Sequence, residues 1–236
     1  MKKNKRIQVA KIIVAIIIVA ILCGFIIKLA PFMANLYTEE GQIAFKAEID
    51  SMGFKGILLL FTLQILQILL VILPGEPFEV LAGMCYGTWG GFWFITISVL
   101  LTTTLIFFTV RKLGQKYLYH FFKKEKVNKI LESKVFKNPA NLYMILFLLF
   151  FLPGTPKDLF VYIGGLLPVK PIRFIMISTF ARFPSVITST MVGARLSQGN
   201  WEMSLLIYLI TFVVASIIIY LVGLKDKNKD IINIIK

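Results

Sequence analysis

The sequence predicts an all-α polytopic membrane protein built around an inverted repeat with two opposed re-entrant helical hairpins. Three observations lead to this fold class: the composition, several long apolar runs, and a Leu-Pro-Gly-x-Pro motif that occurs twice. Of the 236 residues, 58% are hydrophobic and only 16% are charged. Soluble domains carry about 45–50% apolar and about 25% charged residues. This excess of apolar residues excludes a soluble enzyme, because one aqueous core cannot bury it.

The positive charge lies in three segments, and its placement predicts the topology. Residues 1–11, 111–141 and 225–236 carry +5, +7 and +2, which together account for the formal net charge of +14. Cytoplasmic loops of membrane proteins are rich in Lys and Arg, so we expect these segments and both termini in the cytoplasm. Segment 31–55 is acidic and is expected outside. Segment 111–141 has no nucleic-acid recognition motif, so attraction to anionic lipids is the simpler interpretation of its charge.

The first apolar run, 12–30, has 19 residues. A helix of this length measures about 28 Å, close to the hydrocarbon thickness of about 30 Å. A cleaved signal peptide is the alternative, but the run is longer than usual for one and no clear small-x-small cleavage site follows it. We therefore expect a transmembrane helix and an acidic external segment over 1–55.

The next part of the chain predicts a re-entrant hairpin over 56–88, followed by a span over 89–110. If the apolar run 56–73 crossed the membrane completely, the basic linker 111–141 would lie outside, against the charge rule. A turn at Leu-Pro-Gly-Glu-Pro (73–77) returns the chain to the same side and places the linker in the cytoplasm.

The second half repeats this pattern. The apolar run 142–152 has 11 residues, too few to span, and it breaks at Leu-Pro-Gly-Thr-Pro (152–156). We expect a hairpin over 142–169 and a span over 172–193, which complete a core domain at 56–200. A C-terminal transmembrane helix and a basic tail are expected over 201–236.

The two motifs lie 79 residues apart and suggest an internal repeat. An acid follows five positions after the first proline of each motif: Glu79 in the first copy and Asp158 in the second. Hairpins that enter from opposite sides meet near the bilayer midplane, where many transporters build a substrate site from broken helices. The predicted loop breaks are Pro74, Gly75, Pro77, Pro153, Gly154 and Pro156.

Charged residues inside the membrane are the candidate substrate- and proton-binding groups, because charges in hydrocarbon are costly and usually pair or face a cavity. They are Glu76, Glu79, Lys157, Asp158 and Arg182, with Arg173 placed either in the site or at the membrane interface. Pro184 predicts a helix kink beside Arg182. Ser178, Arg182, Ser185 and Ser189 share one helical face, and Gln64 and Gln67 form a second small polar stripe. Such a site can bind a phosphate through Arg while its carboxylates take up protons.

The sequence offers no pattern for catalysis or for a resident metal or cofactor. The two cysteines, Cys23 and Cys85, lie in apolar runs, and the single histidine, His120, lies in the basic linker. Neither a nucleophile–base pair nor a metal-binding spacing is present, so we expect no enzyme, no cofactor and no metal.

Residues 50–200 resemble the DedA superfamily, also called the VTT-domain or SNARE-associated Golgi protein family. The resemblance rests on Phe-Glu-Val-Leu-Ala-Gly (78–83), Gly-Thr-Pro-Lys-Asp (154–158) and the stretch 174–201. Within that stretch, Phe-Ala-Arg-Phe-Pro (180–184) and Gly-Ala-Arg-Leu-Ser-Gln-Gly-Asn-Trp (193–201) are the most similar parts. The chain is most similar to the yeast-Golgi-type bacterial branch, in which a glycine usually occupies the position of Ala181.

The resemblance implies two opposed re-entrant hairpins and movement of lipids across the bilayer. Relatives act as phospholipid scramblases or as flippases for a lipid-linked phosphate carrier, some of them proton-coupled. The family's essential acids correspond to Glu76, Glu79 and Asp158, and its arginines to Arg182 and Arg173. The implied partners are membrane lipids that are anionic or carry phosphate. The motifs specify the superfamily rather than one lipid, and they leave the oligomeric state open.

We therefore expect an integral membrane lipid transporter in a bacterial plasma membrane. Two alternatives stay open at this point. The first is a proton-coupled transporter of a small ion or solute that uses the same carboxylates. The second is a non-transporting assembly factor whose charges only hold helices together.

Overall fold

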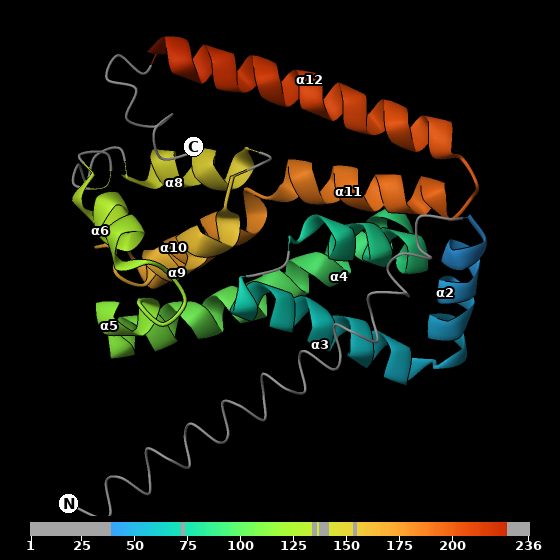
Figure 1. Ribbon diagram of the computed structural model, residues 1–236, viewed down its shortest axis with the longest axis horizontal. Coiled ribbons are helices and arrows are strands. Elements are labelled where there is room, and N and C mark those ends of the chain that lie inside the picture. Colours follow the sequence, from blue (N-terminus) through green and yellow to red (C-terminus); the bar gives the residue numbers. More distant parts are fainter. Residues whose placement is uncertain (1–38, 72–73, 134–135, 137–141, 153–154, 226–236) are drawn as a thin grey trace, which may run out of the picture. The chain divides into compact units, whose positions relative to one another are not determined.

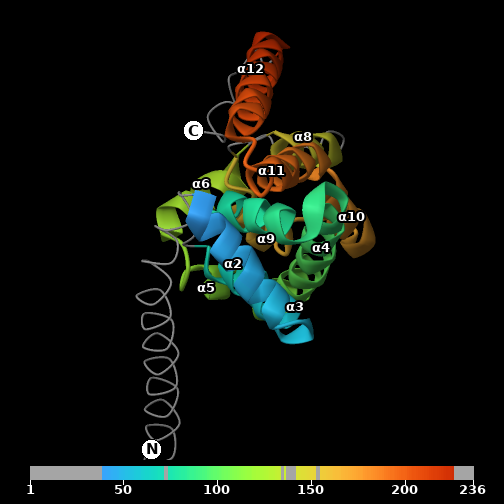
Figure 2. The same cartoon turned by 90° about the vertical axis from the view of Figure 1, so that its right-hand side faces the viewer.

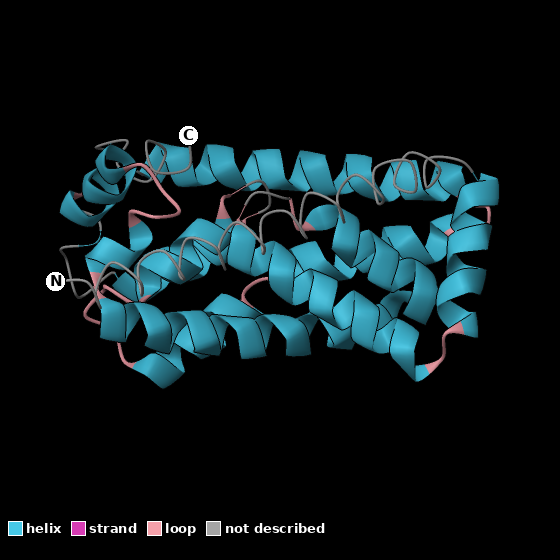
Figure 3. Ribbon diagram, turned by 60° about the horizontal axis from the view of Figure 1, so that its bottom comes forward, coloured by secondary structure: helices cyan, strands magenta, loops and turns pink. Residues whose placement is uncertain are grey.

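The computed structural model describes residues 39–71, 74–133, 136, 142–152 and 155–225. Within these ranges the regular secondary structure is all helical, with loops between the helices, as Figure 3 shows, and the chain contains helices long and apolar enough to cross a membrane. The all-α membrane class is thereby confirmed. The chain divides into two units, 1–48 and 49–236, and helix α2 (Glu39–Ser51) runs across this boundary. The predicted span 12–30 lies outside the described residues.

The first hairpin consists of α3 (Phe54–Leu70) and the first part of α4 (Glu76–Leu113). Helix α4 is broken at Gly87, whose φ of 71° and ψ of 178° are not helical. This conformation suits glycine, which has no Cβ to clash at positive φ. The break separates a short return helix, 76–86, from a long helix, 88–113. Pro77 lies in the first turn of α4, where its missing N–H leaves no hydrogen bond unmade.

The described part of 142–196 forms the helices α8 (Leu142–Phe151), α9 (Lys157–Gly164), α10 (Pro171–Phe180) and α11 (Phe183–Leu196). With 10 residues, α8 is too short to cross a membrane alone. Thr155 caps its C-terminal end, because its hydroxyl donates to the carbonyls of Leu149 and, at 3.0 Å, Leu152. The predicted breaks Pro153 and Gly154 lie outside the described residues.

The predicted kinked span 172–193 consists of two helices, α10 and α11. The chain leaves the helical path at Ala181 and Arg182, and Pro184 stands in the first turn of α11. A proline there cannot donate to the carbonyl of Phe180 and clashes with it, which ends α10. The predicted kink beside Arg182 is confirmed. Together α10 and α11 form one stretch, Pro171–Leu196, long and apolar enough to cross a membrane.

In its described part, the basic linker includes two short helices that the sequence did not indicate, α5 (Gln115–Leu118) and α6 (Lys124–Glu132). In α6, Val127 and Ile130 are buried, whereas the lysines are exposed. The last helix, α12 (Trp201–Lys225), is apolar and largely exposed along its described length. This pattern is typical of a helix surrounded by lipid.

The return helix of the first hairpin packs against α11, and α11 in turn packs against α12 (Figures 1 and 2). Two glycines allow the close approach. A Cβ on Gly83 would collide with the backbone of Thr190, and a Cβ on Gly193 would collide with the backbone of Val80 and Met84. Small residues at such crossings let helices approach closely where the surrounding lipid provides no hydrophobic drive.

The return helix of the second hairpin, α9, packs against the long helix of the first half. Gly165, just after α9, lies against Phe107 and Val110. Each return helix therefore packs on a long helix of the opposite half. Such an exchange agrees with the predicted repeat, while the inversion of that repeat across the membrane stays a prediction.

Arg111, near the end of α4, fixes the segment that follows α9. Its guanidinium donates to the carbonyls of Gly165 at 3.2 Å, Val169 at 3.1 Å and Leu167 at 2.6 Å. It also lies 4.5 Å from the ring centre of Phe107. Carbonyl groups in a turn lack helix partners, and Arg111 supplies three of them with donors.

Candidate functional site

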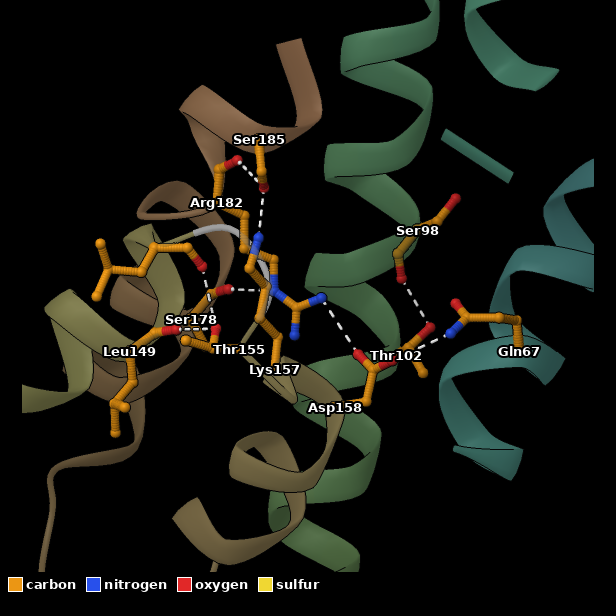
Figure 4. A network of polar contacts seen from close by, with 11 residues as sticks. Gln67, Ser98, Thr102, Leu149, Thr155, Lys157, Asp158, Ser178, Arg182 and Ser185 are labelled. Carbon is orange, nitrogen blue, oxygen red and sulfur yellow. Dashed lines mark hydrogen bonds and ion pairs between the residues drawn. The ribbon is translucent and has the colours of Figure 1, made fainter. Parts of the chain in front are cut away.

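The tips of the two hairpins meet inside the second unit. Gln67, near the end of α3, donates from Nε2 to Oδ2 of Asp158, in the first turn of α9, at 3.0 Å. One turn farther along α9, the Tyr162 hydroxyl donates to the carbonyl of Leu69 at 2.7 Å. Figure 4 shows Gln67 and Asp158 pointing toward one another from different helices. Residues about 90 positions apart in the sequence are thus in direct contact.

Arg182 forms the charged centre of this meeting point. Its Nη1 lies 3.2 Å from Oδ1 of Asp158, and the two side chains are 7% and 18% exposed. Its Nε donates to the carbonyl of Ser178 at 3.1 Å, and the guanidinium lies 5.4 Å from the ring centre of Phe150. Because α10 has already ended at Phe180, Arg182 stands at a helix break, and its side chain reaches across to α9 (Figure 4).

The guanidinium of Arg182 retains unused hydrogen-bonding capacity. Within the described part of the chain, its Nη2 is buried and has no hydrogen-bond partner. Leaving a buried charged donor unpaired is costly, so such a group points to a ligand or to ordered water. A guanidinium presents its donors in a planar fork that matches the oxygens of a phosphate or a carboxylate.

Lys157 brings a second cation next to Arg182. Its Nζ donates to the Ser185 hydroxyl at 2.5 Å, and that hydroxyl donates to the carbonyl of Arg182 at 3.1 Å. Glu79, from the return helix of the first hairpin, is the strongest charged neighbour of Lys157. The Glu79 side chain is buried, and its Oε2 has no hydrogen-bond partner among the described residues.

The remaining two predicted charges lie farther out. Glu76, at the start of α4, is exposed and interacts electrostatically with Lys157 and Glu79. Arg173, in α10, is exposed, and its guanidinium lies 5.7 Å from the ring centre of Tyr143. The structure thus brings Glu79, Lys157, Asp158 and Arg182 together, leaves Glu76 at the edge of this group, and places Arg173 against an aromatic ring instead.

Two further residues complete the group. Gln67 belongs to the polar stripe noticed in the sequence, but nothing there indicated that Asp158 is its partner. Nothing in the sequence indicated that Phe150 lies beside the site, because α8 consists almost entirely of apolar residues. Among the described residues, His, Cys, Asp and Glu form no group of three or more that could hold a metal ion.

These features define a polytopic helical membrane protein in which two broken hairpins meet at a buried ion pair. A family model described as the VTT domain matches residues 73–195, just over half of the chain. The chain therefore belongs to the VTT domain family, also known as the DedA or SNARE-associated family, whose members are membrane proteins with transport or lipid-related roles. No solved structure matches the chain.

Proposed function

We propose that this protein moves a phosphate-bearing lipid across the membrane, as a scramblase or as a flippase for a lipid-linked phosphate. The observation that carries the proposal is the buried Arg182, with its Nη2 unpartnered, at the point where the two hairpin tips meet. Lys157 supplies a second cation beside it. Transport of this kind makes and breaks no covalent bond, so the proposed role is not enzymatic.

The phosphate would be held mainly by Arg182. Its Nη1 and Nε are occupied by Asp158 and Ser178, which fix the plane of the guanidinium. A fixed guanidinium loses little freedom when a ligand binds, which favours affinity. Asp158 also balances the positive charge when no lipid is bound, so that Arg182 is not left as a lone buried charge.

Glu79 is the group that we assign to proton uptake. A buried carboxylate with an unpartnered oxygen is poorly stabilised, and taking up a proton removes that charge. If a lipid phosphate draws Lys157 away from Glu79, the acid loses its strongest cationic neighbour. Phosphate binding and protonation of Glu79 are then coupled, which would make translocation depend on pH.

A translocation assay in proteoliposomes tests the proposal. Fluorescent phospholipids in the inner leaflet are protected from an external reductant until a transporter carries them outward. We expect the wild-type protein to accelerate the loss of fluorescence, and the Arg182→Gln variant to reduce that acceleration by about tenfold or more. Arg195→Gln, at the end of α11, is the matched control because Arg195 is exposed and its guanidinium donates to the exposed Gln198 side chain, away from the buried site. Full activity of a well-folded Arg182→Gln protein would refute the proposal.

The two alternatives make different predictions. A proton-coupled solute transporter should carry protons in vesicles that contain no translocatable phosphate lipid. An assembly factor should lose abundance, rather than activity per molecule, when Asp158 or Arg182 is changed. The proposed location is a bacterial plasma membrane with both termini in the cytoplasm, and labelling of single cysteines in 111–141 from either side of the membrane tests it.

A further inference from the structure

A groove beside the charged site has no role in the function proposed so far. It lies between α11 and α12, next to the end of α8, and its volume is about 240 Å³. Its walls include Pro184 and Thr188 from α11, Val214 and Ala215 from α12, and Phe151 from α8. It is partly open to the surroundings of the protein, and Val214 on its rim is 48% exposed.

The groove offers hydrocarbon surface and almost nothing for a polar ligand to bind. Three hydroxyl groups line it, but each already donates to a carbonyl of its own helix. Ser185 donates to Arg182, Thr188 to Pro184, and Thr211 to Ile207. A polar solute that entered the groove would lose its hydration without gaining new donors, whereas an apolar chain would lose nothing. The lining therefore selects for hydrocarbon.

One residue joins the groove to the charged site. Ser185 lines the groove, and its hydroxyl accepts a hydrogen bond from Lys157. Arg182, whose Nη2 is buried and unpartnered, lies one helical turn before Ser185. A cationic end and an apolar groove thus share a boundary at a single side chain. This arrangement is complementary to a lipid molecule, which has an anionic head and an apolar tail.

We propose that the groove between α11 and α12 binds a hydrocarbon chain of the lipid whose phosphate is held at Arg182 and Lys157. This inference rests on the proposed function and adds a binding site for the tail to the site for the headgroup. The occupant follows from three features of the groove: its lining, its cationic boundary and its position beside α12. That helix is exposed and apolar over most of its described surface, so lipid chains surround it in a membrane.

The size of the groove agrees with this occupant. An apolar cavity of roughly 150 Å³ is large enough to bind benzene. The groove is larger, and it is open, so a chain can lie partly in it and extend into the bilayer. Each methylene buried there adds to affinity, and a chain held in place keeps the headgroup near Arg182.

Photocrosslinking of the full-length wild-type protein in proteoliposomes tests the proposal. The probe is phosphatidylglycerol with a diazirine in one acyl chain, and the comparison probe is diacylglycerol with the same chain and no phosphate. We expect the phosphatidylglycerol probe to label residues 184–188 and 210–218 about tenfold more than the diacylglycerol probe does, because only the former is anchored by its phosphate. Equal labelling by the two probes, or labelling confined to other helices, would overturn the inference.

A pair of variants separates the tail site from the headgroup site. Ala215→Phe fills the groove, since Ala215 lines it and is buried. Val213→Phe adds the same side chain to an exposed position of the same helix. We expect Ala215→Phe to lower both labelling and translocation about tenfold, and Val213→Phe to change neither.

The outcomes distinguish the two proposals. Suppose that Arg182→Gln abolishes translocation, but the Ala215→Phe protein is labelled and translocates lipid as well as the Val213→Phe protein does. The proposed binding site for the tail is then refuted, and the proposed function stands. If the Arg182→Gln protein translocates lipid at the wild-type rate, both the proposed function and the tail site that rests on it are refuted. Should Ala215→Phe elute as an aggregate in size-exclusion chromatography, Thr188→Leu replaces it, because this smaller change fills the groove from α11.

Discussion

The two hairpins carry the same motif but hold their acids differently. In the second hairpin, Asp158 accepts hydrogen bonds from Gln67 and Arg182, one on each oxygen. In the first hairpin, Glu79 occupies the equivalent position, yet its Oε2 has no partner among the described residues. One acid is therefore fixed in an ion pair, and the other keeps an unsatisfied oxygen. A repeated motif can thus supply both a structural acid and an acid that is available for chemistry.

The cations follow the same asymmetry. With the 79-residue offset between the motifs, Lys157 corresponds to Phe78 and Arg182 to Thr103. Both positively charged groups of the site therefore come from the second half. Thr103 is buried in the unbroken part of α4, whereas Arg182 stands at a helix break. The first half contributes Glu79, the acid with an unpartnered oxygen, and the second half contributes the positive charges that we expect to hold the phosphate.

The largest expected effect comes from Arg182→Ala. Removing one partner of a buried ion pair leaves Asp158 as an uncompensated charge, which typically destabilises by about 3–5 kcal/mol. Thermal unfolding of the detergent-solubilised protein measures this loss. The double variant Arg182→Ala with Asp158→Asn should recover most of the stability and none of the translocation. Equal stability of the single and double variants would show that Asp158 is not the group left unpaired.

The next effect tests the contact that joins the two halves. Gly193→Ala places a Cβ against the backbone of Val80 and Met84, so we expect a loss of about 3 kcal/mol, at the upper end for overpacking. Gly90→Ala is the matched control, because a Cβ there meets only the Cβ of Tyr86, at 3.1 Å. The yield of monodisperse protein and its unfolding temperature report the difference. Similar behaviour of both variants would argue against the close crossing.

Neutralising the two acids separately tests the different roles assigned to Asp158 and Glu79. Asp158→Asn loses a charge-assisted bond with Arg182, and we expect a destabilisation of about 2 kcal/mol. Glu79→Gln removes a poorly satisfied buried charge, so its stability should change by less than about 1 kcal/mol while the pH dependence of translocation disappears. Unfolding curves and translocation rates at two pH values provide both readings. A larger stability loss for Glu79→Gln than for Asp158→Asn would reverse the assigned roles.

The smallest effect is expected for Arg173→Ala. Arg173 is exposed and lies over the ring of Tyr143, a contact that contributes under about 1 kcal/mol at exposed sites. Translocation should stay at the wild-type rate in the same assay. A loss comparable to that of Arg182→Gln would place Arg173 in the substrate path.

The sequence predicts the all-α membrane class and the kink beside Arg182 because these depend on local rules. A Pro-Gly pair in an apolar run interrupts a helix wherever it stands, and Pro184 kinks its helix without help from a neighbour. The choice of partners is different. Asp158, rather than Glu79, pairs with Arg182 because of how the return helices cross the long helices, and this crossing depends on contacts at Gly83 and Gly193.

Arg111 is a second residue whose contacts the sequence did not indicate. By position it belongs to the basic linker, and the charge rule treats it as one cation among nine. The structure instead uses its guanidinium to hold three carbonyls of the segment after α9. Charge counting identifies the side of the membrane on which a cation lies, but it does not identify the cations that are engaged in tertiary contacts.

The exchanged packing of the return helices has a mechanical consequence. Residues 76–86 pack against α11, and α9 packs against the long part of α4, so each of these two packed pairs contains pieces of both halves. The chain is interrupted at Gly87 and again just before Phe183. If the two pairs moved relative to one another, the backbone would bend most easily at these interruptions. Because Arg182 stands at one of them and Asp158 lies in α9, such a motion would act on their ion pair.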